Sequence, residues 1–263
     1  MKYTTSFFIV MSCALFFIAC KQKPVDRNTL DFKQKQVAAI TQLLSEKPDS
    51  VGLRLILANE LDSIGQYRRA LLQMDTLIEN DSDKYALWLI KANMLLDSGD
   101  TVSAKENYRK AISIYPGNEA LVGLTEILAD EKNDSSLVLA QQFNRENKYY
   151  TTYIAGLYAA KTGDAEKGLI LLDSCLLQNH QFIKPYLAKG NIYLTKGDAS
   201  NALLTYKKGL DMEPQNILLL NAVGKSYKRL GKGDSAKAYF AKSLLEQPFQ
   251  PVINEDLKTL NVK

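Results

Sequence analysis

The feature that most constrains this chain is a residue pattern that returns every 34 positions. Glycine marks the pattern at Gly65, Gly99, Gly163, Gly197 and Gly231, with intervals of 34, 64, 34 and 34 residues. The interval of 64 is 34 plus 30, so one unit of the series is present but four residues short. Such a period predicts a stack of similar units, because a solenoid extends without one central core.

Two further tracks keep the same phase and indicate how each unit packs. Small residues return as Ala70, Ala104, Gly168, Ala202 and Ala236, and larger apolar residues return as Met74, Tyr108, Leu172, Tyr206 and Phe240. We expect the small residues where two helices cross closely, since a bulky side chain there would overpack the joint. The larger residues are expected to fill the space between neighbouring helices.

Short dipeptides predict the turn between the two helices of a unit. Gly99-Asp100, Gly163-Asp164 and Gly197-Asp198 each place an aspartate directly after a glycine. Glycine takes the left-handed conformation that ends a helix at little cost, and aspartate starts the next helix by accepting backbone N–H bonds. Each unit therefore reads as helix, turn, helix.

In length and residues the units resemble the tetratricopeptide repeat (TPR) family. Gly190-x-x-Tyr193, Ala202-x-x-x-Tyr206 and Pro214 follow the family signature almost fully, and the same pattern returns one period later. The resemblance covers about residues 51–250. It implies an all-α fold, a right-handed superhelical solenoid of helix-turn-helix repeats.

The phase divides the chain into a series of segments. A helix over 30–48 is expected first, then six repeat units, and then a capping helix and tail over 251–263. The units are 51–84, 85–118, 119–148, 149–182, 183–216 and 217–250. The unit 119–148 is degenerate, because Asn133 and Asp134 stand in place of the glycine turn. We expect the curvature to change there, or a hinge to lie there.

The N-terminus reads as an export signal. Lys2 precedes an apolar run from Phe7 to Ala19, which is too short to span a bilayer. The run ends in Phe17-Ile18-Ala19-Cys20, which resembles a bacterial lipobox, although the lipobox prefers leucine where Phe17 stands. The resemblance implies that 1–19 is a lipoprotein signal peptide, Cys20 the lipidated N-terminus and 20–29 the tether. A plain secreted or retained signal segment is the alternative.

The lipid anchor would fix the location of the chain. Several acyl chains hold a protein on a membrane durably. By resemblance to bacterial lipoprotein sorting, Lys21 after the cysteine favours the outer membrane of the cell envelope, with the periplasmic or surface face left open.

The sequence offers little for catalysis. There is no HExxH motif, phosphate-binding glycine loop or cysteine pair at metal-ligand spacing, so we expect no enzyme, metal or cofactor. His180 is expected in a turn between units, and Cys175 at a buried packing position. The net charge of +4 is too weak to indicate nucleic acid binding.

A binding surface follows from the family resemblance. The first helices of TPR units line a concave groove that holds extended peptides or helices. By phase, the candidate groove residues are Asn59, Asn93, Tyr150, Tyr153, Lys184, Asn191, Asn221, Lys225, Lys228 and Arg229, with Leu89, Leu157 and Leu187 between them.

Two sets among these residues indicate a chemistry. Lys225, Lys228 and Arg229 share one helix face, and with Asn191 and Lys184 they resemble the carboxylate clamp of some TPR domains, although the full clamp is not matched. A solvated basic face explains the same residues. Tyr149, Tyr150 and Tyr153 are either an aromatic anchor or core packing.

Two functions remain open at this point. The leading hypothesis is a lipid-anchored scaffold or adaptor that binds protein or peptide partners in the bacterial cell envelope. The alternative is a lipoprotein that captures a glycan or peptide substrate for an outer-membrane transporter.

Overall fold

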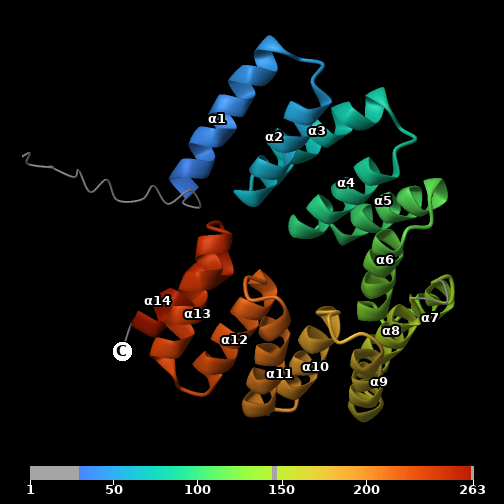
Figure 1. The fold of residues 1–263 in the computed structure, drawn as a ribbon, viewed down its shortest axis with the longest axis vertical. Coiled ribbons are helices and arrows are strands. Elements are labelled where there is room, and N and C mark those ends of the chain that lie inside the picture. Colours follow the sequence, from blue (N-terminus) through green and yellow to red (C-terminus); the bar gives the residue numbers. More distant parts are fainter. Residues whose placement is uncertain (1–29, 144–146, 262–263) are drawn as a thin grey trace, which may run out of the picture.

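In the computed structural model, residues 30–143 and 147–261 are described, and within them the chain is entirely helical apart from turns and loops (Figure 1). The predicted signal peptide, the tether and Cys20 lie outside these residues. The helices are α1 (Leu30–Glu46), α2 (Val51–Ser63), α3 (Tyr67–Asn80), α4 (Tyr85–Asp97), α5 (Thr101–Ile114), α6 (Asn118–Asp130), α7 (Ser135–Ala140), α8 (Lys148–Lys161), α9 (Ala165–Gln178), α10 (Lys184–Thr195), α11 (Ala199–Met212), α12 (Ile217–Arg229), α13 (Gly233–Glu246) and α14 (Pro251–Asn261).

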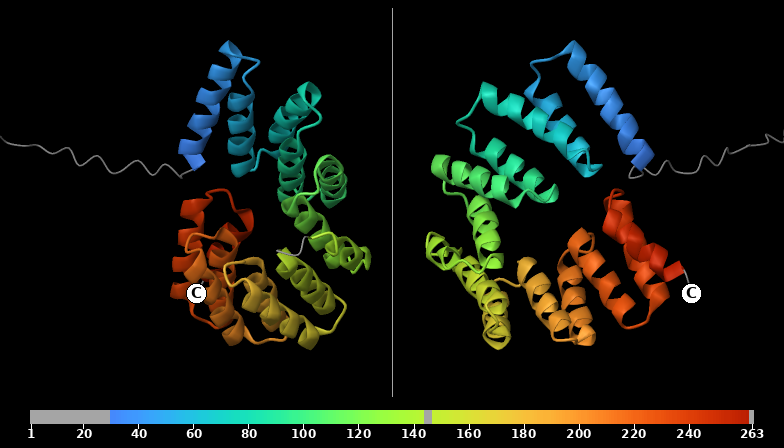
Figure 2. Two further views of the ribbon diagram at one scale, coloured as in Figure 1. Left: turned by 45° about the vertical axis from the view of Figure 1, so that its right-hand side comes forward. Right: turned by 180° about the vertical axis from the view of Figure 1, so that it is seen from behind.

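The helices stack as antiparallel pairs along a curved superhelix. α2 and α3 form the first pair and α12 and α13 the sixth, with α1 and α14 flanking the series. The views in Figure 2 show that the stack curls round until its last helices lie close to its first ones. The expectation of an all-helical right-handed solenoid is confirmed. No helix in 30–143 or 147–261 combines the length and hydropathy that crossing a bilayer requires.

The turns between paired helices have the predicted chemistry. Backbone φ is positive at the five period-marking glycines, between 72° and 105°. After three of them an aspartate caps the next helix: Asp100 accepts from Ser103 N at 3.0 Å, Asp164 from Lys167 N at 3.0 Å and Asp198 from Asn201 N at 2.9 Å. These bonds satisfy N–H groups that the first turn of a helix cannot bond internally.

The small and large tracks pack as expected. Ala70, Ala104, Ala202 and Ala236 are fully buried, and so are Tyr206 and Phe240. The ring of Tyr206 lies on Gly190 of the facing helix, where any Cβ would overlap it. The period therefore records close helix crossings.

The third unit differs from the prediction in its turn. Asn133 and Asp134 were expected to replace the glycine, but Lys132 takes the left-handed conformation, with φ of 57°. Lys132 N bonds to Ala129 O at 3.0 Å and Asn133 N to Leu128 O at 2.8 Å, the pattern that Gly99 and Asp100 make. The second helix of this unit is short, since α7 has six residues where α5 and α9 have 14. Figure 1 shows the stack changing direction between α6 and α8.

Helix α14 closes the C-terminal end of the stack. Ile253 is 2% exposed against Phe240 and its neighbours. Gln250 is buried at the start of α14, and its Nε2 donates to Ser243 O at 3.0 Å and to Gln247 O at 2.8 Å. These contacts hold α14 over the last apolar face.

Candidate partner-binding groove

First helices of four consecutive units line one cavity of about 500 Å³ on the inner side of the superhelix. We call it the groove cavity. Its lining residues include Glu126 and Asp130 of α6, Tyr153, Leu157 and Lys161 of α8, Lys184, Leu187 and Asn191 of α10, and Leu218 of α12. This volume lies within the range of small-ligand pockets. The curvature of the stack thus brings residues from positions 126 to 218 to one site.

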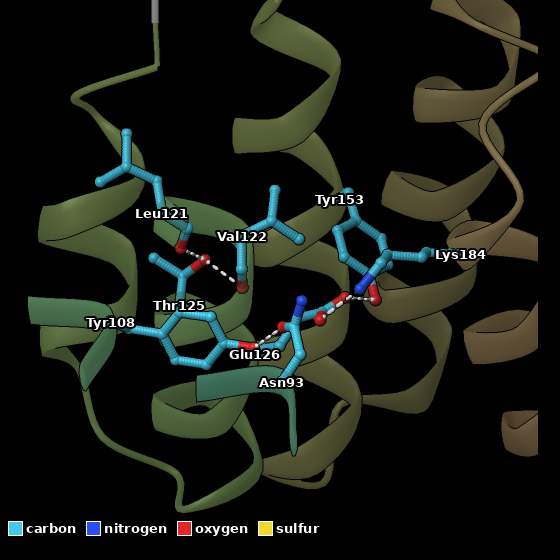
Figure 3. A network of polar contacts seen from close by, with 8 residues as sticks. All are labelled: Asn93, Tyr108, Leu121, Val122, Thr125, Glu126, Tyr153 and Lys184. Atoms are coloured by element: carbon cyan, nitrogen blue, oxygen red, sulfur yellow. Dashed lines mark hydrogen bonds and ion pairs between the residues drawn. The ribbon is translucent and has the colours of Figure 1, made fainter. Parts of the chain in front are cut away.

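A network of polar contacts forms one wall of the groove cavity (Figure 3). The Glu126 carboxylate accepts from the Tyr153 hydroxyl at 2.7 Å and from Lys184 Nζ at 2.6 Å. Burial, reinforced by the Glu126 charge, raises the pKa of Tyr153 well above its usual range, so its hydroxyl stays a donor. Asp130 pairs with Lys161 at 2.6 Å. The network ties α6, α8 and α10 together.

The predicted amides at Asn93 and Asn191 are oriented by tyrosines of their own units. Asn93 Oδ1 accepts from the Tyr108 hydroxyl, and Asn191 Oδ1 accepts from the Tyr206 hydroxyl, each at 2.6 Å. Both tyrosine rings are buried, and burial raises their pKa values, so both hydroxyls stay neutral donors. Because the carbonyl oxygen is held from behind, each exposed asparagine presents its NH₂ group as a donor.

The predicted aromatic residues are mostly packing. Tyr153 is only 4% exposed. Tyr150 packs against Tyr149, Phe143 and Phe182, with ring centroids 4.3, 5.0 and 5.1 Å away. This cluster fills the space next to the short helix α7, and Cys175 is buried nearby with its thiol donating to Tyr149 O at 3.2 Å. Burial raises the pKa of Cys175 to about 12, which makes it an unreactive thiol.

The predicted basic face on α12 is partly engaged within the chain. Lys228 pairs with Asp256 of α14 at 2.7 Å, and Asn221 Nδ2 donates to Gln250 Oε1 at 2.7 Å. Arg229 Nη1 donates to Leu194 O at 3.0 Å and remains exposed. Lys225 is exposed and makes no ion pair with the described part of the chain. Lys225 and Arg229 are therefore the accessible cations of this face.

Two other predicted residues stand apart from the α12 face. Lys184 lines the groove cavity and is paired with Glu126. Asn59 is exposed on α2, far along the stack from α10. The structure thus gathers Tyr153, Lys184 and Asn191 at the cavity and spreads the remaining candidates along the superhelix.

Sequence reasoning missed Glu126 and Asp130. Asn59, Asn93 and Asn191 each stand six residues before the left-handed turn residue of their unit, and Glu126 stands six before Lys132. The spacing of six residues is therefore present in the third unit too, but without a glycine to mark its turn the groove-facing position could not be assigned. Asp130, two residues before Lys132, matches Lys161, two before Gly163.

An acidic pair lies at the other end of the stack. Burial, together with the nearby Asp97 carboxylate, raises the pKa of Asp62 to about 7, and Asp62 Oδ1 is buried without a hydrogen-bond partner. Asp97 precedes Gly99 by two residues, the position that Asp130 holds before Lys132. First helices therefore carry acidic groups in units one and two and accessible basic groups on α12.

Sequence profiles of the tetratricopeptide repeat match residues 55–119 and 183–216. This chain contains tetratricopeptide repeats. A tetratricopeptide repeat protein of known structure from Parabacteroides merdae superposes with a TM-score of 0.61 at 14% identity, covering 88% of this chain and 93% of that one. At this identity the similarity concerns the fold, and it agrees with the stacked helix pairs.

Curated relatives share the repeats within longer chains. Protein CTR9 homolog of Arabidopsis thaliana is 23% identical over 70% of this chain, and Hsp70-Hsp90 organizing protein 2 of the same plant is 24% identical over 65%. Cellulose synthase operon protein C of Pseudomonas fluorescens is 26% identical over 77%. The TPR protein spans 18%, 37% and 17% of these three chains, respectively. TPR proteins bind protein or peptide partners, typically as scaffolds without catalytic activity.

Proposed function

We propose that this TPR protein is a scaffold of the bacterial cell envelope, anchored by a lipid on Cys20, that binds a protein or peptide partner in its concave groove. The observation that carries the binding role is the groove cavity itself, where four consecutive units meet at one site of about 500 Å³. The anchor rests on the lipobox-like run that ends at Cys20.

The chemistry of the cavity favours an extended peptide. Leu157, Leu187 and Leu218 give apolar contact, and the Asn191 amide offers a donor to a backbone carbonyl. The lining carboxylates Glu126 and Asp130 are already paired with lysines. The partner that fits is a segment with an apolar side chain at the cavity and acidic groups towards α12, where Lys225 and Arg229 are accessible.

A matched pair of leucines tests the groove. Leu218 of α12 is 64% exposed and lines the cavity, whereas Leu204 of α11 is 55% exposed and lies outside it. We expect Leu218→Glu to deplete the partner captured with the tagged, membrane-extracted protein, because a carboxylate would lie in the apolar contact, while Leu204→Glu retains it. Quantitative mass spectrometry of the captured material measures this. Equal depletion by both variants, or by neither, would refute binding in the groove, and saccharide binding by the purified protein would favour substrate capture.

Charge reversal tests the basic face without disturbing α14. Lys225→Glu combined with Arg229→Glu removes the accessible cations and leaves the Lys228–Asp256 pair in place. Affinity for the captured partner should fall by about tenfold or more, with thermal unfolding nearly unchanged, because surface charges contribute little to stability. Unchanged affinity would show that this face is only a solvated surface.

The anchor has its own test. Cys20→Ala should move the protein from the membrane fraction to the soluble fraction, because no thioether-linked lipid can form. Cys175→Ala is the control, since that thiol is buried. An unchanged membrane fraction for Cys20→Ala would refute lipidation and leave the groove hypothesis standing.

A further inference from the structure

The turn of the first unit differs from the other glycine turns in one respect. A Cβ built on Gly99, Gly163, Gly197 or Gly231 meets nothing within 4 Å. A Cβ built on Gly65 would overlap the ring of Phe249, which is 184 residues away in the sequence. The first turn of the solenoid is therefore covered by the loop between α13 and α14.

This contact joins the two ends of the superhelix. Gly65 lies between α2 and α3, and Phe249 lies between α13 and α14. Figures 1 and 2 show these ends close together from each direction, with the other helix pairs completing the circuit between them. The curvature that creates the groove cavity thus also brings the ends of the stack together.

The residues at the contact suit a joint that closes and opens. Glycine allows the aromatic ring to lie directly on the backbone, which no other residue permits there. Phe249 is only partly buried, in contrast to the fully buried Phe240 of the neighbouring core. Gln250 and Ile253 hold α14 independently of this ring. Opening the contact would therefore leave the cap in place.

We infer that Phe249 and Gly65 form a clasp that closes the superhelix into a ring around its groove. With the clasp closed, the groove is bounded on every side by helix pairs, and a partner segment reaches it along the axis of the ring. With the clasp open, the curvature of the superhelix decreases and its two ends move apart. The groove then widens on the side of α1 and α14. The clasp concerns the free protein and does not depend on the identity of a partner.

Two glycine substitutions separate the clasp from ordinary backbone strain. Gly65→Ala and Gly99→Ala both place a side chain at positive φ, 76° and 87° respectively, so both should lose similar stability. Only Gly65→Ala displaces Phe249. Small-angle neutron scattering of the full chain in contrast-matched detergent should show a larger radius of gyration for Gly65→Ala than for Gly99→Ala or the unmodified protein.

Phe249→Ala tests the same contact without strain in the turn. We expect a larger radius of gyration and about tenfold faster hydrogen exchange at Gly65 and Gln66, with exchange in the Gly99 turn unchanged. An unchanged radius in both Gly65→Ala and Phe249→Ala would overturn the clasp. So would faster exchange at Gly65 without expansion, because the ring would then only shield one turn.

Discussion

The fifth and third units of this TPR protein build the same turn from different residues. In the fifth unit, Gly197 has φ of 82° and Asp198 caps α11 by accepting from Asn201 N at 2.9 Å. In the third unit, Lys132 has φ of 57°, and Asn133, at the position that Asp198 holds, accepts from Ser135 N at 2.9 Å. The backbone path through both turns is alike, although only the fifth unit has glycine at the left-handed position.

Packing compensates in the third unit. In the fifth unit, Gly190 receives the ring of Tyr206, and α11 runs for 14 residues. In the third unit, α7 is a short stub, but α6 is buried from Ala120 to Ala129, with Glu126 as the partly exposed exception. A repeat therefore tolerates the loss of its turn glycine when its first helix is buried along most of its length, and Glu126, the partly exposed residue of that stretch, lines the groove cavity.

The largest expected effect tests this dependence on α6. Leu121 is fully buried, so Leu121→Ala should lower the free energy of unfolding by about 2–5 kcal/mol through lost contacts and a cavity. Val138→Ala on α7, at a side chain that is 67% exposed, should change it by less than about 0.5 kcal/mol. Chemical denaturation followed by circular dichroism measures both. Similar costs for the two substitutions would contradict the enclosed-helix account.

Gly190→Ala probes the regular unit. The added methyl group overlaps the Tyr206 ring, so we expect a loss of about 1–3 kcal/mol in unfolding free energy. Gly52→Ala on α2 meets nothing within 4 Å and should be neutral or stabilising, because alanine favours the helix. The same denaturation experiment gives both values. A tolerated Gly190→Ala would mean that the glycine track does not report close crossings.

Lys132→Gly should stabilise the third unit by about 1 kcal/mol, because glycine adopts positive φ without the steric cost that lysine bears. The transition midpoint in denaturant, with m unchanged, is the measurement. A loss of stability would show that the Lys132 side chain contributes more than its backbone strain costs.

Low pH should destabilise the turn of the fifth unit more than the turn of the third unit, and this effect should be smaller than those of the substitutions above. The backbone N–H of Asn201 holds the pKa of Asp198 below its usual range, so the cap stabilises the folded state above the ordinary aspartate pKa and is lost as pH falls through the lowered value. Below about pH 4, hydrogen exchange in the first turn of α11 should accelerate relative to α7, after correction for intrinsic rates. Equal acceleration of hydrogen exchange in α11 and α7 would show that the Asp198 cap does not distinguish the two turns.

Particular residues show how far the sequence predicts this molecule. Gly197, Asp198 and Tyr206 define their unit locally, so its helices, turn and inward-facing Asn191 follow from phase alone. Glu126 was not predicted as a groove residue, because the turn that sets its register has lysine at position 132 in place of glycine.

Contacts between distant segments were beyond reach of the repeat pattern. The Lys228–Asp256 pair depends on how α14 docks, and the Gly65–Phe249 contact depends on curvature summed over every helix crossing. Neither contact can be predicted from the residues of a single repeat unit.

The most direct test of the central claim places a photoreactive amino acid at Leu187 or at Leu177 in living cells. Leu187 lines the groove cavity, whereas Leu177 is 90% exposed on α9, outside it. Binding in the groove predicts a defined crosslinked protein adduct from position 187 and none from position 177. Adducts of equal yield from both positions, or only from position 177, would contradict it.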